Sequence, residues 1–274
     1  NKLTEKMRLD EADIPVPAYR SIDSADDLEA AFDALGEELM LKARMGGYDG
    51  RGNHVVASVE DATAYFGDLE GLVAEELIDF TREVSVIGVR GEDDIATYPV
   101  GENVHEAEIL RQTFVPARTD ESVWNRADEI ARDVLRVLDG RGVFGIELFE
   151  TESGAVLVNE IAPRPHNSGH YTIEGAITSQ FEQHVRAILG LPLGATDLHR
   201  PTVMTNLLGD VEESRSAALS GVEAALEVSG AHFHWYGKHQ VRPLRKMGHV
   251  TATGQTIEDA KERSERARST LTFE

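Results

Sequence analysis

Short apolar runs that come in closely spaced pairs constrain the fold of this chain more than any other feature. We expect strands at residues 38–42 and 53–57, 83–90 and 95–100, and 142–149 and 155–160, with a further strand at 72–76. Helical patterns lie around these pairs, at residues 1–12, 24–35, 60–70, 120–138, 174–189, 214–227 and from about residue 257 onward. Because hairpins alternate with helices, the pattern predicts an α+β fold and not a continuous parallel sheet.

The charge of the chain is unusual for its size. The sequence has 49 acidic and 27 basic residues, a net charge of −22, and only six of the basic residues are lysines. Such a surface holds hydration water and salt cations well, and its self-repulsion is tolerable when salt screens it. The composition therefore indicates a halophilic protein, with an ordinary acidic mesophilic protein as the alternative. It gives no basic surface for nucleic acid or for an anionic membrane.

Composition also limits the compartment and the chemistry. Cysteine is absent from the 274 residues, which excludes disulfides and thiol catalysis. No apolar run approaches the roughly 18–20 residues that span a bilayer, and the charged opening NKLTEKMRLDEADIP has no signal-peptide pattern. Hydrophobic residues make up 41% of the chain, enough for a packed core. We expect a cytoplasmic protein of one large domain or two ordinary ones.

A glycine-rich segment joins the first strand pair. Lys42 ends an apolar strand, and ARMGGYDGRG follows, with glycines at 46, 47, 50 and 52. Glycines let backbone amides approach phosphate oxygens, and a neighbouring lysine supplies a point charge. The segment lacks the GK[ST] of a Walker loop, and a mobile hairpin tip is the alternative.

Acidic residues stand at the ends of two later strands. Glu75 and Glu76 end one strand, and Glu83 begins the next. A strand end can offer its backbone to a purine edge, while a carboxylate can hold ribose hydroxyls. Solvated strand ends are the alternative in a chain this acidic.

Two carboxylates face each other across the third strand pair. Glu147 and Glu160 lie on its two arms, and directly opposed side chains are about 5 Å apart at Cβ. Both are flanked by apolar residues, and two such carboxylates repel each other unless a cation lies between them. Mg²⁺ held by one or two carboxylates and substrate phosphates fits this arrangement. A coincidental pair of edge carboxylates is the alternative.

The segment after Glu160 is stiff and basic. Pro163 and Pro165 restrict the backbone on either side of Arg164, and His166 follows. These residues can fix a guanidinium and an imidazole beside a reacting anion, while the amide of Asn159 can support a metal–phosphate group. A stiff connector with incidental basic residues is the alternative.

Together these segments resemble the ATP-grasp enzymes, and most closely the N5-carboxyaminoimidazole ribonucleotide synthetases. Six blocks carry the resemblance, in the family's order: LKARMGGYDGRGNHVV, EELIDFTREVSVIGVRG, YPVGENVHEAEILRQT, VFGIELFE, VNEIAPRPHNSGHYTIEGAITSQFEQHVRAILGLPLG, and HWYGK with RPLRKMGHV. The resemblance implies ATP- and bicarbonate-dependent carboxylation of 5-aminoimidazole ribonucleotide through carboxyphosphate, in purine biosynthesis.

The resemblance also assigns residues by position. The nucleotide contacts it implies are Lys42, Gly47, Tyr48, Asp49, Gly50, Arg51, Gly52, Asn53, Glu75, Glu76, Leu77, Ile78, Glu83, His105, Asn159 and Glu160, of which Tyr48, Asp49 and Arg51 look like substrate contacts. Glu147 and Glu160 match magnesium ligands, and Arg164 and His166 match the groups at bicarbonate and the reacting amine. Lys238, Arg245 and Lys246 match a basic cluster at the ribonucleotide 5′-phosphate, with Lys246 also a catalytic candidate.

The resemblance implies two α+β lobes as an ATP-grasp domain over residues 1–192, and a small β-rich C-terminal domain over 193–274. The family opens with a further domain that has a glycine-rich strand–turn–helix, and nothing like it precedes Asn1. We therefore expect a truncated chain. The alternatives are a related ligase such as the formate-dependent glycinamide ribonucleotide transformylase, or a non-catalytic nucleotide-binding fragment. A homodimer is left open.

Overall fold

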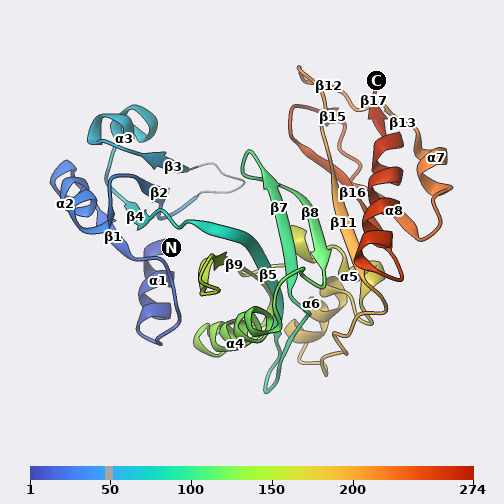
Figure 1. Ribbon diagram of the computed structural model, residues 1–274, viewed down its shortest axis with the longest axis horizontal. Helices are drawn as coiled ribbons and strands as arrows, with labels where there is room; N and C mark the ends of the chain where they lie inside the picture. The colour runs from blue at the N-terminus through green and yellow to red at the C-terminus, as the bar shows by residue number, and fades with distance from the viewer. Residues whose placement is uncertain (47–51) are drawn as a thin grey trace. The chain divides into compact units, whose positions relative to one another are not determined.

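The structure is a computed structural model that describes residues 1–46 and 52–274 (Figure 1). Its chain forms two compact units. The first contains Asn1–Thr81 and Leu148–Asn159, and the second contains Arg82–Glu147 and Glu160–Glu274. Each unit is described by itself. The predicted glycine-loop residues Gly47, Tyr48, Asp49, Gly50 and Arg51 lie outside the described residues.

The first unit is built on a four-stranded sheet. Its strands are ordered β1-β4-β2-β3, and all three pairings are antiparallel. The elements are α1 (Lys2–Asp10), β1 (Tyr19–Ile22), α2 (Ala25–Leu35), β2 (Leu39–Ala43), β3 (Asn53–Val56), α3 (Val59–Phe66) and β4 (Leu72–Glu76).

Helices α2 and α3 begin where the sequence places a capping serine. The Ser24 and Ser58 side chains accept from the backbone N–H groups of Asp27 and Asp61, satisfying amides that the helix itself leaves unpaired. α2 packs against β1 and β4, and α3 packs against β3. Their apolar faces bury Leu28 and Ala62 with strand residues such as Leu41, so one core closes this unit.

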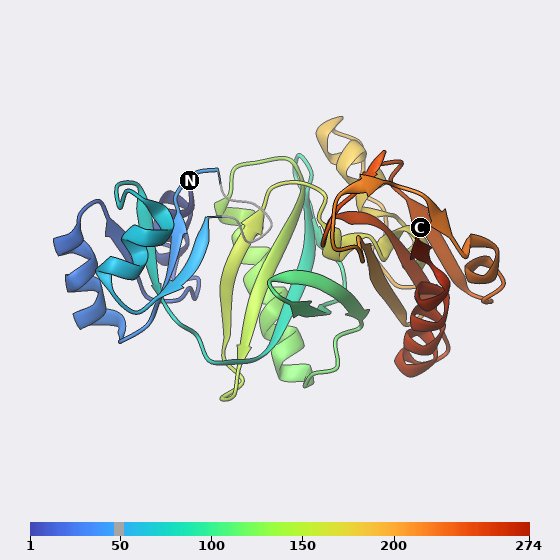
Figure 2. The ribbon, with the colours of Figure 1, turned by 90° about the horizontal axis from the view of Figure 1, so that it is seen from above.

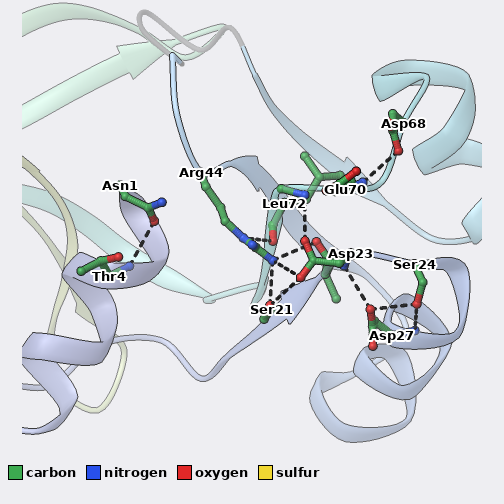
Figure 3. A network of polar contacts seen from close by, with 12 residues as sticks. Asn1, Thr4, Ser21, Asp23, Ser24, Asp27, Arg44, Asp68, Glu70 and Leu72 are labelled. Carbon is green, nitrogen blue, oxygen red and sulfur yellow. Dashed lines mark hydrogen bonds and ion pairs between the residues drawn. The ribbon is translucent and has the colours of Figure 1, made fainter.

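Arg44 anchors the chain just before the glycine-rich segment (Figure 3). Its guanidinium donates to the Leu72 carbonyl (2.9 Å), the Ser21 hydroxyl (2.7 Å) and the Asp23 carboxylate (2.8 Å). Asp23 also accepts from the Gly71 N–H at 3.0 Å. These three acceptors from two stretches of chain thereby hold Arg44, which lies just before the first glycine of the loop.

The second unit is built around a larger sheet. Three strands of this sheet, β5, β9 and β10, also include residues of the first unit. Its order is β10-β9-β5-β7-β8-β11-β16-β14, with β6 paired to β5. These strands are β5 (Phe80–Arg90), β6 (Ile95–Thr97), β7 (Gly101–Glu106), β8 (Ile109–Val115), β9 (Gly142–Thr151), β10 (Val156–Ala162), β11 (Thr202–Leu208), β14 (Ala231–Trp235) and β16 (Lys246–Thr253). The pairings of β5 with β6 and β7, β7 with β8, β8 with β11, β11 with β16 and β14 with β16 are antiparallel.

Helices and small strand pairs complete the second unit. The helices are α4 (Glu121–Val137), η1 (Asn167–Gly169), α5 (Thr172–Gly175), α6 (Gln180–Ile188), α7 (Val222–Leu226) and α8 (Ile257–Thr270). The small pairs are β12 (Arg215–Ser216) with β15 (Gln240–Val241), and β13 (Leu219–Ser220) with β17 (Thr272–Phe273). Figure 2 shows α8 beside the strands of this unit, and α8 contacts both β11 and β16.

Two close approaches explain how helices seat on this sheet. A Cβ at Gly88 of β5 would lie 2.8 Å from Leu135 of α4, so glycine there makes room for a buried leucine. On α8 the buried residues are small, and the Ser264 hydroxyl lies 2.6 Å from that of Thr205 on β11. The small side chains let α8 lie close to the strands.

The α+β prediction is confirmed, and most expected elements are present within a few residues. The helix expected at 174–189 is two helices, because residues 176–179 are extended and Ser179 starts α6 with its own cap. The helix expected at 214–227 was wrong over its first half. Residues 215–216 and 219–220 pair with strands far along the chain, and that pairing overrides local helix propensity. The hairpin β7–β8 was not predicted.

Among residues 1–46 and 52–274, no helix is both long and apolar enough to cross a bilayer.

Candidate functional site

A buried carboxylate with two lysines forms the polar centre of the first unit. The Lys42 Nζ of β2 and the Lys6 Nζ of α1 lie 3.0 Å and 3.1 Å from the same oxygen of Glu75, on β4. Lys42 also donates to the Asn159 side-chain carbonyl at 3.0 Å. All three charged residues are at most 5% exposed. Burial lowers the pKa of Lys6, and the charge of Glu75 opposes that shift.

Lys6 was missed by sequence reasoning, although a signal was available. It lies three residues before Leu9, so the two share a face of α1, and both are buried. A lysine on the buried face of a short helix needs a partner, because a buried charge is costly unless it is paired. The predicted residues Lys42, Glu75 and Asn159 are brought together, and Lys6 joins them.

A second group of charges lies in the second unit and is built around carboxylates. Glu147 of β9 and Glu160 of β10 belong to it, and Glu83 of β5 lies near them. Burial raises the pKa of Glu147 to about 7, and the charges of Glu160 and Glu83 add to that rise, while His105 and Lys246 oppose it. Glu147 is therefore buried with both like and opposite charges around it.

His105 reaches this group through an irregularity in its strand. The β7–β8 register shifts between Val104 and His105, and such bulges commonly redirect a side chain. Its Nδ1 lies 3.0 Å from a Glu83 oxygen. Burial disfavours the imidazolium, but the neighbouring Glu83 outweighs burial and raises the pKa of His105.

The segment after β10 brings His166 to Glu147. The His166 Nε2 lies 3.6 Å from a Glu147 oxygen, and its Nδ1 lies 2.9 Å from the Ser168 hydroxyl. Ser85 of β5 donates to that hydroxyl at 3.1 Å. Burial, with the positive charges of Arg164 and Lys246, lowers the pKa of His166 to about 4, so the ring is neutral near pH 7.

The basic residues of the predicted phosphate cluster separate into two settings. Lys246 begins β16, and its charge acts on Glu147, His105 and His166. Lys238 donates to the Lys246 backbone carbonyl, whereas the Arg245 guanidinium donates to the Gln240 carbonyl at 2.8 Å. Lys246 thus lies near the carboxylates around Glu147, whereas the Arg245 side chain bonds to the backbone of β15.

Most of the remaining predicted residues lie in or beside the strands of the first unit, and Arg164 lies in the second. Asn53 pairs with Lys42 across β2 and β3, and the Gly52 carbonyl accepts from the Ala43 N–H at 2.7 Å. Glu76 accepts from the Ala18 N–H at 3.0 Å, and Leu77 and Ile78 follow it outside β4. Arg164 is exposed and donates to the Pro165 carbonyl.

Within the described parts of the chain, no group of three or more His, Asp or Glu side chains has a geometry that could hold a metal by itself. A site made of two carboxylates leaves ligand positions for other molecules, which is how Mg²⁺ is usually bound with phosphates.

Two family models match this chain. The ATP-grasp domain matches residues 7–181, and the phosphoribosylaminoimidazole carboxylase C-terminal domain matches residues 202–263. The structure of N5-carboxyaminoimidazole ribonucleotide synthetase from Thermotoga maritima is 41% identical, with a TM-score of 0.88 over 99% of this chain and 71% of that one. The chain belongs to the N5-carboxyaminoimidazole ribonucleotide synthetase family.

Two further members of the synthetase family frame the comparison. The Bacillus subtilis N5-carboxyaminoimidazole ribonucleotide synthase is 41% identical over 259 residues, which cover 92% of this chain and 65% of that protein. The Aspergillus clavatus enzyme, solved in complex with ADP and 5-aminoimidazole ribonucleotide, is 34% identical with a TM-score of 0.86, over 98% of this chain and 72% of that one. The chain thus spans about two thirds of the length of these synthetases.

Proposed function

We propose that this chain carries the ATP-dependent carboxylation of 5-aminoimidazole ribonucleotide to N5-carboxyaminoimidazole ribonucleotide, with bicarbonate as the carbon source. The observation that carries the proposal is the group around Glu147. The carboxylates of Glu147, Glu160 and Glu83 lie near the neutral imidazole of His166, which suits a site that binds a metal–phosphate group and then moves a proton. Membership of the synthetase family supports the same reaction.

For nucleotide binding, we assign Lys42 to the phosphates of ATP. Glu75 has two lysines, so one positive charge remains in the first-unit group to meet a phosphate. We assign Gly47–Asn53 to closure over the phosphates, Glu75–Ile78 and Glu83 to the base and ribose, and His105 and Asn159 to the same nucleotide. The Aspergillus clavatus complex with ADP supports a nucleotide in this family.

The residues present fit a magnesium ion. Glu147 and Glu160 would hold it, and burial with the charges of Glu160 and Glu83 raises the pKa of Glu147, which a cation bound there would offset. When bound, the metal supplies charge neutralisation for the transferring phosphoryl group.

For the carboxylation itself, we assign Arg164, His166 and Lys246. Arg164 is always charged and can hold a carbonate bidentately. Bicarbonate would attack the γ-phosphate to give carboxyphosphate, and the substrate amine would capture the CO₂ released from it. The Ser168 backbone N–H donates to His166 Nδ1 at 3.4 Å, and the Ser168 hydroxyl can donate to that nitrogen or accept from it. Nε2 would take the amine proton in the tautomer whose Nδ1–H donates to that hydroxyl.

For the ribonucleotide, we assign Lys238 and Arg245 to the 5′-phosphate, with Lys246 between that phosphate and the reacting groups. Tyr48, Asp49 and Arg51 are assigned to the same substrate. We further propose that residues 1–192 form the ATP-grasp domain and 193–274 the small C-terminal domain. The gap between the two family matches, at 182–201, supports a boundary there.

ADP release measured with and without 5-aminoimidazole ribonucleotide tests the function. We expect release that requires bicarbonate and Mg²⁺ and that yields a carboxylated imidazole. Turnover with glycinamide ribonucleotide and formate instead would favour the related transformylase. ATP binding without turnover would favour a non-catalytic fragment.

The roles of Arg164 and His166 can be separated from nucleotide binding. Arg164→Lys and His166→Asn should keep ATP affinity and lose carboxylated product, while ADP still forms because carboxyphosphate decomposes unused. The measurement is ATP affinity together with the ratio of ADP formed to imidazole carboxylated. Loss of ATP affinity in both variants would place this segment in the nucleotide site instead.

We also propose that the protein is a cytoplasmic, halophilic homodimer. Helix α6 exposes an apolar stripe of Phe181, Val185 and Ile188, and Glu182 and Arg186 flank it in an ion pair of 2.6 Å. A two-fold axis across α6 would bring each Arg186 toward the other copy's Glu182, so the stripe is self-complementary in charge. Val185→Glu should reduce the sedimentation mass to that of a monomer. An unchanged mass would place the interface elsewhere, and a monomeric wild type would refute the dimer.

A further inference from the structure

One buried side chain holds the backbone of His166 at both of its polar groups. Gln180, the first residue of α6, is fully buried. Its Oε1 accepts from the His166 N–H at 2.9 Å, and its Nε2 donates to the His166 carbonyl at 2.7 Å. A side-chain amide paired in this way fixes both the position and the orientation of the residue it holds.

The same amide reaches the far end of the turn that follows. Gln180 Nε2 lies 3.0 Å from the His170 Nδ1, and the Gln180 backbone N–H donates to Thr172 Oγ1 at 2.9 Å. Thr172 in turn donates to the Gly169 carbonyl at 2.7 Å. Gln180, at the start of α6, therefore contacts the chain on both sides of the Asn167–Gly169 turn.

Two glycines pack closely against the Gln180 side-chain amide and the His166 side chain. A Cβ at Gly169 would lie 2.5 Å from Gln180 Oε1, and a Cβ at Gly145 would lie 2.5 Å from the Cβ of His166. His166 is thus confined between the amide on its backbone and β9 on its side chain, which is what brings Nε2 to Glu147.

We propose that Gln180 is a positioning residue for the carboxylation step, acting through the backbone of His166. The inference rests on the proposed function, because it needs His166 at the reacting amine. Gln180 touches neither Glu147 nor Glu160 among its hydrogen bonds, so its removal should disturb the transfer of the carboxyl group and leave nucleotide binding intact.

The chain supplies a matched control on the same helix. Gln183 is also fully buried, and it makes the same pair of bonds to another residue. Its Oε1 accepts from the Gly194 N–H at 2.9 Å, and its Nε2 donates to the Gly194 carbonyl at 2.7 Å. Gly194 belongs to neither of the two charged groups. Substitution at 183 therefore measures the cost of losing a buried amide clamp without loss of the positioned histidine.

The experiment compares Gln180→Met with Gln183→Met in the full-length protein, since methionine keeps the volume and removes the hydrogen bonds. We expect a fall in thermal midpoint in both variants, because each leaves one backbone N–H unpaired. The Gly194 carbonyl also loses its donor, whereas the His166 carbonyl keeps the Gly169 N–H at 3.0 Å. Only Gln180→Met should lose kcat for carboxylation, by about 100-fold, the size of loss that a 1 Å misplacement can cause. Its KM for ATP should stay at the wild-type value, and its ratio of ADP to carboxylated product should rise.

Amide hydrogen exchange gives a readout that does not depend on turnover. The His166 amide should exchange faster in Gln180→Met only, and the Gly194 amide faster in Gln183→Met only. Gly169→Ala, which pushes the Gln180 amide aside, should reproduce the Gln180→Met kinetics and serves if that variant does not fold.

Equal kinetic losses in the two methionine variants would overturn the positioning role, as would a raised KM for ATP in Gln180→Met. A wild-type protein that carboxylates nothing would contradict the proposed function, and unchanged His166 exchange in Gln180→Met would separately contradict the clamp.

Discussion

The two units each bury a glutamate among charged neighbours, but they treat it in opposite ways. Glu75 in the first unit has two ammonium groups, 3.0 Å and 3.1 Å from one of its oxygens. Glu147 in the second unit has one imidazole nitrogen at 3.6 Å, and the charges of Glu160 and Glu83 act against it. The first carboxylate is compensated from within the protein. The second has no ammonium group at such a distance among its described contacts, and burial, with the charges of Glu160 and Glu83, raises its pKa to about 7.

The difference indicates that the Glu75 group is stable without a ligand, whereas the Glu147 group is suited to bind a cation. A buried carboxylate with its own cations is stable as it stands, and it leaves one lysine charge to spare. A buried carboxylate with other carboxylates near it is costly to ionise, and a bound cation would lower that cost. We therefore expect the same change, glutamate to glutamine, to act differently in the two units.

The largest effect should be on activity. Glu147→Gln and Glu160→Gln keep side-chain shape and remove the charge that would hold Mg²⁺, so ATP-dependent turnover should fall by at least about 100-fold, as when one preorganised electrostatic group is removed. The measurement is Mg²⁺-dependent ADP release, with circular dichroism to confirm the fold. Mg²⁺-dependent turnover at the wild-type rate in both variants would refute the metal assignment.

The next effect should be on stability, with opposite signs in the two units. Glu75→Gln leaves Lys6 and Lys42 buried without a counter-charge, which should cost about 3–5 kcal/mol, the usual result of breaking a buried pair. Glu147→Gln removes an uncompensated carboxylate and should stabilise the ligand-free protein above pH 7. Urea denaturation of both variants without Mg²⁺ measures this. Destabilisation by Glu147→Gln at that pH would mean that its charge is compensated after all.

Sequence reasoning reached both groups and missed what makes them different. The predicted residues stand at strand ends or between apolar residues, and this pattern can be recognised from a few neighbouring positions. They are Lys42, Glu75, Glu147 and Glu160. The number of cations around each carboxylate depends on Lys6, from a helix near the start of the chain, and on Lys246, from near its end. No spacing rule relates residues so far apart.

The fold was predictable for a similar reason. Periodicity predicted most of the helices and strands, since its signal lies within a few residues along the chain. The start of the helix expected at 214–227 failed because β12 and β13 pair with strands near the end of the chain. Gln180 gave no sign of its role, because its partner His166 lies on a separate segment that only the fold brings near.

A third effect, smaller in size, is a pH dependence of stability. The folded pKa of Glu147 is about 7 against an ordinary 4.5, so between these values the folded state binds more protons than the unfolded state. Stability from this group therefore falls as pH rises from about 4.5 to 7.

Three histidines act with the opposite sign, because desolvation lowers the pKa values of His166, His170 and His249 to about 4, 4 and 2. The measurement is thus a difference, the thermal midpoint of wild type minus that of Glu147→Gln at each pH. A difference that does not fall across this window would contradict the uncompensated carboxylate.

The smallest expected effect, counted per residue, is the effect of salt on the thermal midpoint through the surface charges. With a net charge of −22, the thermal midpoint should rise from about 0.1 M to 2 M KCl, as the Debye length falls from ~10 Å to below ~3 Å. Buried pairs are screened much less, so the loss from Glu75→Gln should persist at both concentrations. A flat or falling midpoint would show that the acidic surface is no adaptation to salt.

The strand order of the larger sheet has a consequence for synthesis. β7 and β8 are neighbours in the chain and can pair as soon as both have left the ribosome. The other edge of β8 pairs with β11, and residues 116–201 must be made before that partner exists. Until then β8 carries an open edge, which is a site for pairing with other chains. Contacts this distant in sequence form slowly. During synthesis, one edge of β8 therefore stays unpaired until β11 has been made.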